Sequence, residues 1–315
     1  MQPIRYAYLE TTNHCNLSCS FCNREEVIGP LKHMSLENWK LMLEKIKHHP
    51  IKEAKLMGMG EPFMHPQFFN ITKSFKDTFP DAFLIVATNC QYKITFNFRE
   101  AIKHIDMLYL SIDGYESNYE RDRPPAKWSK LLSFLQQLDT VDRGSCKVVI
   151  NYVVNTQNVD DIEKVKQLGE KHGIHEIRLN MAQDWNPDES IKKDDRTWGY
   201  SNEQIQTLQT KWKPFIKGKS EWNFDQCFWV KDGLYTTVEG HVKACCMNTA
   251  AEPFGNLFES DVDSIRKTNR YQEVKRGCET NNPSEHCKNC SYKELSPLLE
   301  ELGVNSSVGT DASEN

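Results

Sequence analysis

Residues 4–22 read IRYAYLETTNHCNLSCSFC and combine a short strand pattern with three closely spaced cysteines. Cys15, Cys19 and Cys22 follow the spacing C-x₃-C-x₂-C directly after the strand. Structural zinc sites take four protein ligands, commonly from two C-x₂-C pairs. Three thiolates at this spacing suit three corners of a [4Fe–4S] cube. The stretch therefore predicts a cluster whose fourth iron is open to a small molecule, on a loop at the end of a first strand. A zinc ion completed by His14 or a remote residue, or reduced thiols without metal, are the alternatives.

Strand and helix patterns alternate six times over the first 183 residues. The expected strands cover residues 4–11, 53–57, 82–88, 106–113, 147–154 and 175–181. Amphipathic helical patterns separate them, and one of these begins after Ser35, a suitable N-cap residue. Such alternation is typical of a parallel sheet covered by helices. Six units are fewer than the eight of a closed barrel, so the sequence predicts an α/β fold with a partial (β/α)₆ TIM-like barrel over residues 1–183. Its ligands should lie at the carboxyl ends of the strands.

The alternation stops after residue 183. Residues 184–220 are expected to form a polar connector and then a helix over 202–216. Residues 221–300 are expected to form a small α+β domain with a β-hairpin that turns at Glu239-Gly240. Residues 301–315 are small and polar, which predicts a disordered tail.

Composition narrows the class of protein. The 315 residues carry a net charge of −5 with both signs mixed, and no basic block predicts binding to nucleic acid or an anionic membrane. The apolar runs are too short to span a bilayer, and the first residues do not resemble a signal peptide. These features predict a cytoplasmic protein, in which eleven cysteines bind metal or carry out chemistry rather than forming a disulfide framework.

The cysteine loop resembles the signature of the radical S-adenosylmethionine (SAM) superfamily, C-x₃-C-x-aromatic-C, with Phe21 as the aromatic residue. This resemblance implies that the amino and carboxylate groups of SAM chelate the open iron. An electron from the cluster would cleave SAM to a 5′-deoxyadenosyl radical, and the radical would abstract a hydrogen atom from the substrate. It also implies an electron donor of the flavodoxin or ferredoxin type as a partner.

Two further segments resemble motifs of the same family. Gly58-Met59-Gly60-Glu61-Pro62 follows the second strand and resembles the GGEP motif, with Met59 in place of the more usual glycine. In the family this motif binds the SAM amino group through its backbone and its acidic residue, and small residues allow that close approach.

The segment LSIDG resembles the segment that contacts the SAM ribose, which implicates Ser111 and Asp113. A plain turn at Asp113-Gly114 is the alternative. Asn151 on the fifth strand is a second polar candidate. Arg121 or Arg123 could meet the SAM carboxylate, because arginine forks match carboxylates, or could be a solvated loop charge.

Two isolated cysteines are expected to have no ligand role. Thr88-Asn89 resembles the polar end of the family's third strand, and Cys90 follows where glycine is common. Cys90 is therefore expected to be a packed thiol, and Cys146 is expected to be inert.

A second set of cysteines lies in the last third of the chain. The spacing C-x₁₂-G-x₄-C, followed later by C-x₂-C, resembles the SPASM and twitch extensions of radical SAM enzymes. This resemblance implies one auxiliary [4Fe–4S] cluster held by Cys227, Cys245, Cys287 and Cys290. Four thiolates would also suit a structural zinc. Cys246 could replace Cys245, and Cys278 is either a spare thiol or the remnant of a second site.

The resemblance leads to a functional hypothesis: dehydrogenation of a hydroxyl-bearing small molecule such as a sugar or aminocyclitol, as in the aminocyclitol dehydrogenase of that family. The auxiliary cluster would accept the second electron. Because the chain starts at the first barrel strand, the leader-binding domain of peptide-modifying relatives is not expected. Oxidation, crosslinking or epimerisation of a peptide is the first alternative, and a non-catalytic iron–sulfur or zinc protein is the second. The residues considered as proton acceptors, at strand ends, are Tyr8, Glu10, Asn180, Gln183 and Trp185.

Overall fold

Six parallel strands form the centre of the fold in the computed structural model, which describes residues 3–183, 199–220, 222–246, 251–284, 287 and 290–305. These strands are β1 (Tyr6–Leu9), β2 (Glu53–Leu56), β3 (Phe83–Thr88), β4 (Met107–Ser111), β5 (Lys147–Val154) and β6 (Ile177–Met181). They pair in chain order, and every pair is parallel. The predicted partial (β/α)₆ barrel is therefore confirmed.

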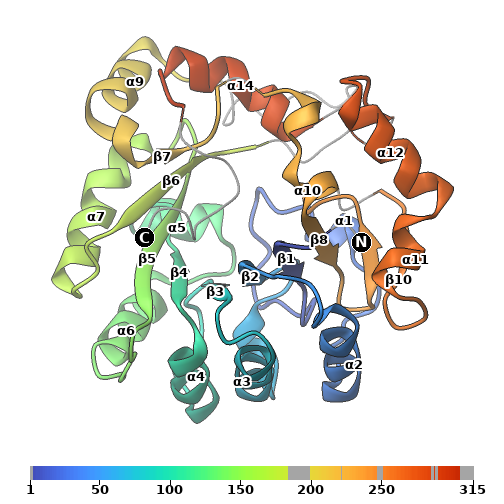
Figure 1. Cartoon of the computed structure of the whole chain (residues 1–315). Helices are drawn as coiled ribbons and strands as arrows, with labels where there is room; N and C mark the ends of the chain where they lie inside the picture. The colour runs from blue at the N-terminus through green and yellow to red at the C-terminus, as the bar shows by residue number, and fades with distance from the viewer. Residues whose placement is uncertain are drawn as a thin grey trace.

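Helices cover the outer face of these strands, and Figure 1 shows them as an arc around the curved sheet. They are α2 (Leu36–Ile46), α3 (Phe68–Thr78), α4 (Phe96–Ala101), α6 (Trp128–Leu138) and α7 (Ile162–Lys171). Helix α2 begins as predicted, because the Ser35 hydroxyl accepts a hydrogen bond from the Asn38 backbone N–H at 3.1 Å. It buries Trp39, Leu43 and Ile46 against the sheet. Two short helices, α1 (Arg24–Val27) and α5 (Ser117–Asp122), follow β1 and β4.

The sheet continues past both edges of the barrel. Strand β7 (Ile216–Lys217) pairs with β6, and β8 (Gly233–Thr236) pairs in parallel with β1. Strands β9 (His241–Lys243) and β10 (Gly255–Asn256) then add antiparallel pairs. The predicted hairpin is present as β8 and β9, and Gly240 in its turn has φ +80°, which favours glycine. The hairpin is thus an extension of the barrel sheet, which the sequence patterns did not predict.

The predicted helix over 202–216 is shorter than expected. Helix α9 (Asn202–Thr207) leads into a π-helical turn and then a 3₁₀ turn over Lys213–Phe215, after which β7 begins. Pro214 lies in that last turn and has no backbone N–H to continue an α-helix. The connector residues 184–198 lie outside the described residues.

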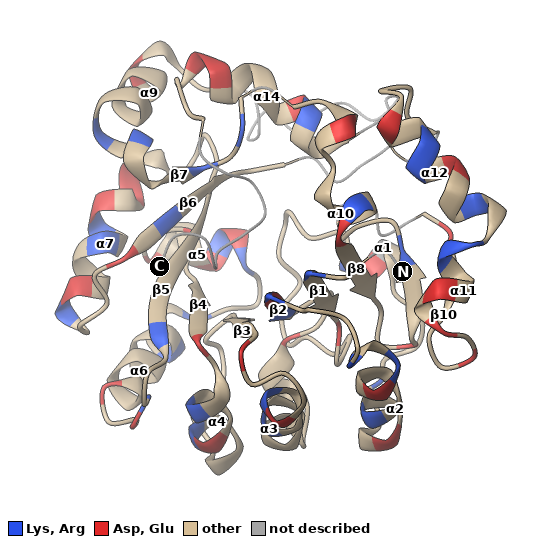
Figure 2. Ribbon diagram, in the orientation of Figure 1, with Lys and Arg blue, Asp and Glu red and all other residues tan. Residues whose placement is uncertain are grey.

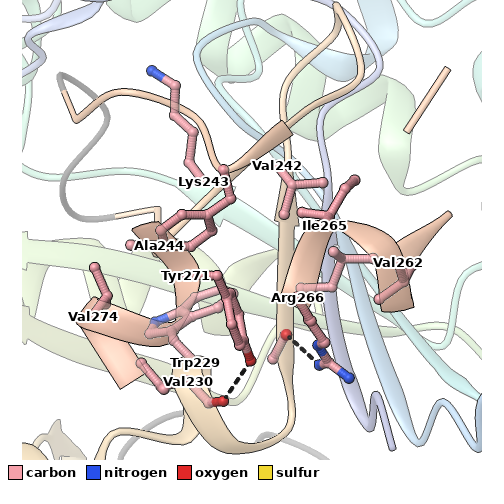
Figure 3. A pocket seen from close by; sticks show the side chains of 13 residues that line it. Trp229, Val230, Val242, Lys243, Ala244, Val262, Ile265, Arg266, Tyr271 and Val274 are labelled. Atoms are coloured by element: carbon pink, nitrogen blue, oxygen red, sulfur yellow. Dashed lines mark hydrogen bonds between the residues drawn. The ribbon is translucent and has the colours of Figure 1, made fainter. Parts of the chain in front are cut away.

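Short helices pack against the hairpin. Helix α10 (Phe228–Lys231) precedes β8, while α11 (Val262–Arg266) and α12 (Asn269–Glu279) follow β10. Figure 3 shows the Tyr271 hydroxyl donating to the Val230 carbonyl, at 3.0 Å, and Arg266 directed at the Gly233 carbonyl. The cavity between these side chains has a volume of only about 20 Å³, room for about one water molecule.

Helix α14 (Ser291–Glu301) ends the described fold. Val304 beyond it is buried, and Asn305 forms a β-bridge with Lys219. The predicted disordered tail therefore does not include residues 301–305, and residues 306–315 lie outside the described residues. None of the described helices combines the length and apolar character that crossing a bilayer requires.

Candidate functional site

A cavity of about 510 Å³ lies at the carboxyl ends of the barrel strands. Its volume is in the usual range of small-molecule sites. Eleven of the predicted barrel site residues line it: Cys15, Cys19, Phe21, Cys22, Gly58, Met59, Gly60, Glu61, Ser111, Arg123 and Asn151. The structure thus brings together the cysteine loop, the loop after β2, residues of β4 and β5, and Arg123 at the end of α5, as the barrel hypothesis requires.

Backbone contacts hold the cysteine loop against the rest of the rim. The backbone N–H groups of Ser18 and Ser20 donate to the carbonyls of Pro124 and Asp122, at 2.6 and 3.0 Å. The Cys22 N–H donates to the Cys19 carbonyl at 3.0 Å, which closes a turn between two of the thiols. The loop is therefore shaped by its neighbours as well as by its own sequence.

Polar groups stand next to two of the loop thiols. The Asn89 side-chain amide lies 3.7 Å from the Cys15 sulfur, and an Arg123 N–H lies 3.8 Å from the Cys19 sulfur. Burial raises the pKa of the Cys19 thiol to about 12, while the Arg123 charge opposes that rise. Metal ligation requires the thiolate, and these donors stabilise negative charge on sulfur. The donor set therefore fits an iron–sulfur cluster.

The described residues also bear on the zinc alternative. No group of three or more His, Cys, Asp or Glu side chains among them is positioned to hold a single metal ion. Thiolates on separate irons of a cube lie farther apart than four ligands around one zinc. The spacing of three thiols on one loop is what fits three corners of a [4Fe–4S] cube at this site.

Gly60 lies where the second-strand loop packs against the cysteine loop. A Cβ atom on Gly60 would lie 2.8 Å from the His14 carbonyl oxygen, and closer still to that of Thr12. The Glu61 backbone N–H donates to the same His14 carbonyl at 2.7 Å. Glycine is therefore required here by the cysteine loop itself, which is a reason that the sequence did not reveal.

Glu61 is buried and held in one orientation. Its carboxylate accepts hydrogen bonds from the Thr88 hydroxyl at 2.9 Å and the Asn89 backbone N–H at 2.7 Å. Burial raises the pKa of Glu61 to about 7, although these hydrogen bonds oppose the rise. Thr88-Asn89, predicted only as a polar strand end, thus positions the acidic group of the GMGEP segment.

Asp113 does not line the cavity. Its side chain is fully buried and forms an ion pair with Arg123, whose Nε donates to the carboxylate at 2.6 Å. The second carboxylate oxygen accepts from the Val153 N–H at 2.7 Å. Arg123 lies beside the Phe21 ring, 5.2 Å from its centroid, whereas Arg121 pairs with Asp122 and is not in the cavity wall. Of the two arginines, the structure brings Arg123 to the site.

The candidate proton acceptors separate into two groups. Tyr8, Asn180 and Gln183 line the cavity. Glu10 does not, because its buried carboxylate accepts from the N–H groups of Met59 and Val238, at 2.9 and 3.1 Å. Glu10 therefore joins the GMGEP loop to the hairpin. Trp185 lies outside the described residues.

The auxiliary thiols that meet include Cys278, which the predicted set left out, beside Cys227, Cys287 and Cys290 of that set. The Cys278 thiol, on α12, forms hydrogen bonds with the thiols of Cys227 and Cys287. Cys290 lies close enough to Cys227 and Cys287 for their charges to interact, and burial raises the pKa of its thiol to about 11.

Cys245 and Cys246 have tyrosine neighbours. Both lie within electrostatic range of Tyr235 and Tyr292. Cys246 also lines the large cavity. The structure thus identifies Cys278 as a member of the auxiliary thiol group, whereas the spacing had left it unassigned.

Several cavity residues were missed by the motif search. Lys55 on β2 and Arg178 on β6 line the cavity, together with Trp222 and with Tyr292 of α14. A charged residue in the middle of an otherwise buried strand was an available signal for the first two. Trp222 and Tyr292 could not be found in this way, because tertiary packing alone brings them to the barrel.

Comparison with known proteins decides the family. The model described as "Radical SAM superfamily" matches residues 9–169, which is half of the chain. The chain belongs to the radical SAM superfamily. A second model, SPASM, described as "Iron-sulfur cluster-binding domain", matches residues 227–291. Members of the superfamily are catalytic, and the two domains imply a SAM-binding [4Fe–4S] cluster and an auxiliary cluster.

Individual relatives are distant. The chain is similar to the sporulation killing factor maturation protein SkfB of Bacillus subtilis, with 22% identity over 91% of this chain and 69% of SkfB. It is also similar to a probable GTP 3′,8-cyclase of Saccharolobus islandicus, with 23% identity over 56% of this chain. The chain spans 57% of the length of that cyclase.

Solved structures confirm the fold. Streptococcus suis SuiB bound to its precursor peptide SuiA aligns with a TM-score of 0.68 and 15% identity, covering 98% of this chain and 76% of SuiB. BtrN in complex with AdoMet and 2-DOIA aligns with a TM-score of 0.56 and 13% identity, covering 92% of this chain and 94% of BtrN. At these identities the alignments establish the radical SAM fold and leave the substrate class open.

Proposed function

We propose that this radical SAM enzyme is an oxidoreductase that dehydrogenates a hydroxyl-bearing small molecule, such as a sugar or aminocyclitol. The observation that carries the proposal is the cavity itself. Its wall contains the cysteine loop and the GMGEP segment together with Trp222, Cys246 and Tyr292 of the SPASM-matched region and its neighbours. A volume of about 510 Å³ suits SAM with a small substrate, and the barrel strands and α14 both bound it.

The proposed cofactor contacts follow the placement of the residues. Cys15, Cys19 and Cys22 would hold the SAM-binding cluster, and Cys227, Cys287 and Cys290 would hold the auxiliary cluster with Cys245 or Cys278. When bound, the clusters supply the electron that cleaves SAM to the 5′-deoxyadenosyl radical, and an acceptor for the electron that the substrate radical loses.

The chain's own side chains would bind and orient SAM. Glu61 would receive the SAM amino group, since Thr88 and Asn89 already hold its carboxylate in the cavity wall. Arg123 would meet the SAM carboxylate, with Asp113 holding the guanidinium from behind. Ser111 and Asn151, paired neighbours on β4 and β5, would contact the ribose.

Oxidation of an alcohol to a carbonyl removes a carbon-bound hydrogen atom, the hydroxyl proton and one electron. The hydrogen atom would become part of 5′-deoxyadenosine. The proton needs an acceptor near the substrate hydroxyl. Of the predicted acceptors that line the cavity, Tyr8 has an ionisable group, whereas the amides of Asn180 and Gln183 can only bind and orient the hydroxyl.

The test is anaerobic turnover of the reconstituted enzyme with SAM, a reductant and candidate alcohols deuterated at the carbinol carbon. Deuterium should appear in 5′-deoxyadenosine, and about one molecule of carbonyl product should form for each molecule of 5′-deoxyadenosine. Accumulation of 5′-deoxyadenosine without any carbonyl product would contradict the dehydrogenase assignment.

Radical modification of a peptide is the second candidate, and the similarity to SkfB over 91% of the chain favours it. The same anaerobic turnover assay distinguishes the two functions when a short peptide encoded beside this gene is supplied in place of the alcohols. A mass change in that peptide, coupled to 5′-deoxyadenosine formation, would support this candidate instead.

A further inference from the structure

Asn89 directly follows β3, and it contacts two parts of the candidate site at once. Its backbone N–H donates to the Glu61 carboxylate at 2.7 Å. Its side-chain Nδ2 donates to the Cys15 sulfur at 3.7 Å. The residue is buried and lines the cavity. Asn89 therefore joins the acidic group of the GMGEP segment to one thiol of the cysteine loop.

Neighbouring groups fix which end of the Asn89 amide faces the thiol. Its Oδ1 accepts a hydrogen bond from the Gln91 backbone N–H at 2.9 Å, which places the NH₂ group at the other end. Nδ2 also donates to the Asn16 side-chain oxygen at 2.8 Å. Because an amide NH₂ group has two hydrogens, the second one is left for the Cys15 sulfur. Asn16 is held in turn, since its own Nδ2 donates to the Gln91 carbonyl at 2.9 Å.

The turn that carries Asn89 has an unusual backbone conformation. Cys90 has φ +60°, a left-handed region that residues other than glycine, asparagine and aspartate seldom adopt. Its side chain is fully buried, and its N–H donates to the Thr88 hydroxyl at 3.3 Å. The Tyr119 hydroxyl donates to the Asn89 carbonyl at 3.1 Å. A strained backbone persists only where its surroundings hold it, and such residues cluster at functional sites.

The Asn89 amide supplies polarity without a formal charge. Strand β3 contains no charged residue, whereas both signs of charge lie on the outer helices α3 and α4 in Figure 2. Burial raises the pKa of the Cys15 thiol, and the Glu61 carboxylate adds to the rise, so both disfavour negative charge on this sulfur. An N–H donor stabilises that charge and offsets part of the cost.

Negative charge on the sulfurs increases when an iron–sulfur cluster is reduced. A cluster held by the three loop thiols would take up one electron from an external donor of the flavodoxin or ferredoxin type. Its charge would then become more negative by one, and part of that charge lies on the ligating sulfurs. Hydrogen bonds to the sulfurs therefore favour the reduced form, and they are among the features that set cluster potentials.

We propose that Asn89 is a positioning residue that raises the reduction potential of the SAM-binding cluster through its hydrogen bond to the Cys15 sulfur. This inference goes beyond the proposed function, because it does not depend on the substrate. It does depend on ligation by Cys15. Cys15→Ala tests that point separately and should lower the iron content by about four per chain. Full retention of iron in Cys15→Ala would overturn the proposal.

An anaerobic redox titration of the full-length, cluster-loaded enzyme without substrate, followed by electron paramagnetic resonance, measures the potential. The signal that changes when SAM is added to a reduced sample identifies the loop cluster. Asn89→Leu and Asn89→Ala remove the side-chain donor and keep the backbone N–H that donates to Glu61. In each variant, reduction of the loop cluster should become about tenfold less favourable, which is a shift of about 59 mV to more negative potential for a one-electron couple. The auxiliary-cluster signal should keep its potential.

Asn97 on α4 provides the matched control. Its Oδ1 accepts from the Phe69 backbone N–H at 2.9 Å, and its Nδ2 donates to the His65 carbonyl at 3.1 Å. Asn97 is not in the described cavity wall. Asn97→Leu therefore removes the same kinds of hydrogen bond away from the cysteine loop and should keep the potential of the parent. Iron and sulfide analysis of every variant shows how much cluster it holds.

Three further results would overturn the tuning role. The first is an unchanged or raised potential in the Asn89 variants, and the second is an equal shift in Asn97→Leu. The third is loss of the loop cluster from both Asn89 variants, because Asn89 would then be needed for cluster assembly instead. The dehydrogenase proposal fails or holds separately, since these titrations contain no substrate and the turnover assay reports carbonyl product.

Discussion

The two cysteine-rich regions are built in different ways. Cys15, Cys19 and Cys22 belong to one loop after β1, and all three line the same cavity. The auxiliary thiols come from separate elements spread over residues 227–290, and the thiol in contact with both Cys227 and Cys287 is Cys278. Spacing identifies ligands where one loop supplies them all. Where helices and a hairpin deliver them, packing decides which thiols meet.

Removing a loop thiol should have the largest effect. Cys19→Ala should lower the iron content by about four per chain and abolish SAM cleavage, since a cube with two protein ligands is not retained. Iron and sulfide analysis together with 5′-deoxyadenosine formation measures both effects. Cys146→Ala is the matched control, because this buried thiol is not in the cavity wall. A Cys19→Ala protein that still cleaves SAM would show that the loop is not the cluster site.

The auxiliary region gives a sharper test of the comparison. If contacts decide the ligands, Cys278→Ala should lose about four irons per chain while Cys245→Ala keeps them, with SAM cleavage retained in both. If spacing decides the ligands, Cys245→Ala should lose the irons and Cys278→Ala should keep them. Iron counting and electron paramagnetic resonance of the reduced variants distinguish these outcomes. Loss of iron in both variants would mean that each thiol is needed.

Gly60 tests how tightly the loop site is packed. Gly60→Ala places a methyl group against the carbonyls of Thr12 and His14, which rigid backbone cannot easily avoid. We expect a loss of about 1–3 kcal/mol in unfolding free energy and weaker SAM binding. Thermal unfolding measures the change in stability, and SAM titration measures the change in SAM affinity. Gly29→Ala is the control, since the nearest atom to its added Cβ would be 3.6 Å away. Equal behaviour of the two variants would contradict the packing argument.

Glu10 should give the smallest effect, because it joins the GMGEP loop to the hairpin and is not part of the cavity wall. In Glu10→Gln, an amide nitrogen replaces one of the two carboxylate oxygens that accept hydrogen bonds from the Met59 and Val238 N–H groups. The lost hydrogen bond should lower the free energy of unfolding by about 1 kcal/mol. Burial raises the pKa of Glu10, so the folded protein keeps this proton to a higher pH than the unfolded chain does. The stability from this group is therefore present at low pH and is lost as the pH rises through the raised pKa. When the free energy of unfolding is measured against pH, the pH-dependent contribution of Glu10 should be absent from the Glu10→Gln variant.

Much of the loop site could be predicted from the sequence. The strand before Cys15, the glycines of GMGEP and the arginine fork of Arg123 are local features, and each lies where parallel strand ends converge. Asp113 is the instructive exception. Its sequence context resembles a ribose-contacting segment, but its carboxylate faces Arg123 and the Val153 N–H, away from the cavity. A motif places the residue at a strand end and does not determine which neighbour its side chain meets.

The sequence alone determined the parallel α/β barrel, the position of its ligand edge and the cysteine loop, because hydrophobic periodicity and short ligand spacings are local properties of the chain. Tertiary structure alone decided that the hairpin extends the barrel sheet beside β1, that Cys278 joins the auxiliary thiols, and that Lys55 and Arg178 share one cavity. The physical reason is that these contacts join residues far apart in the chain, so they depend on how a curved sheet and its covering helices pack together.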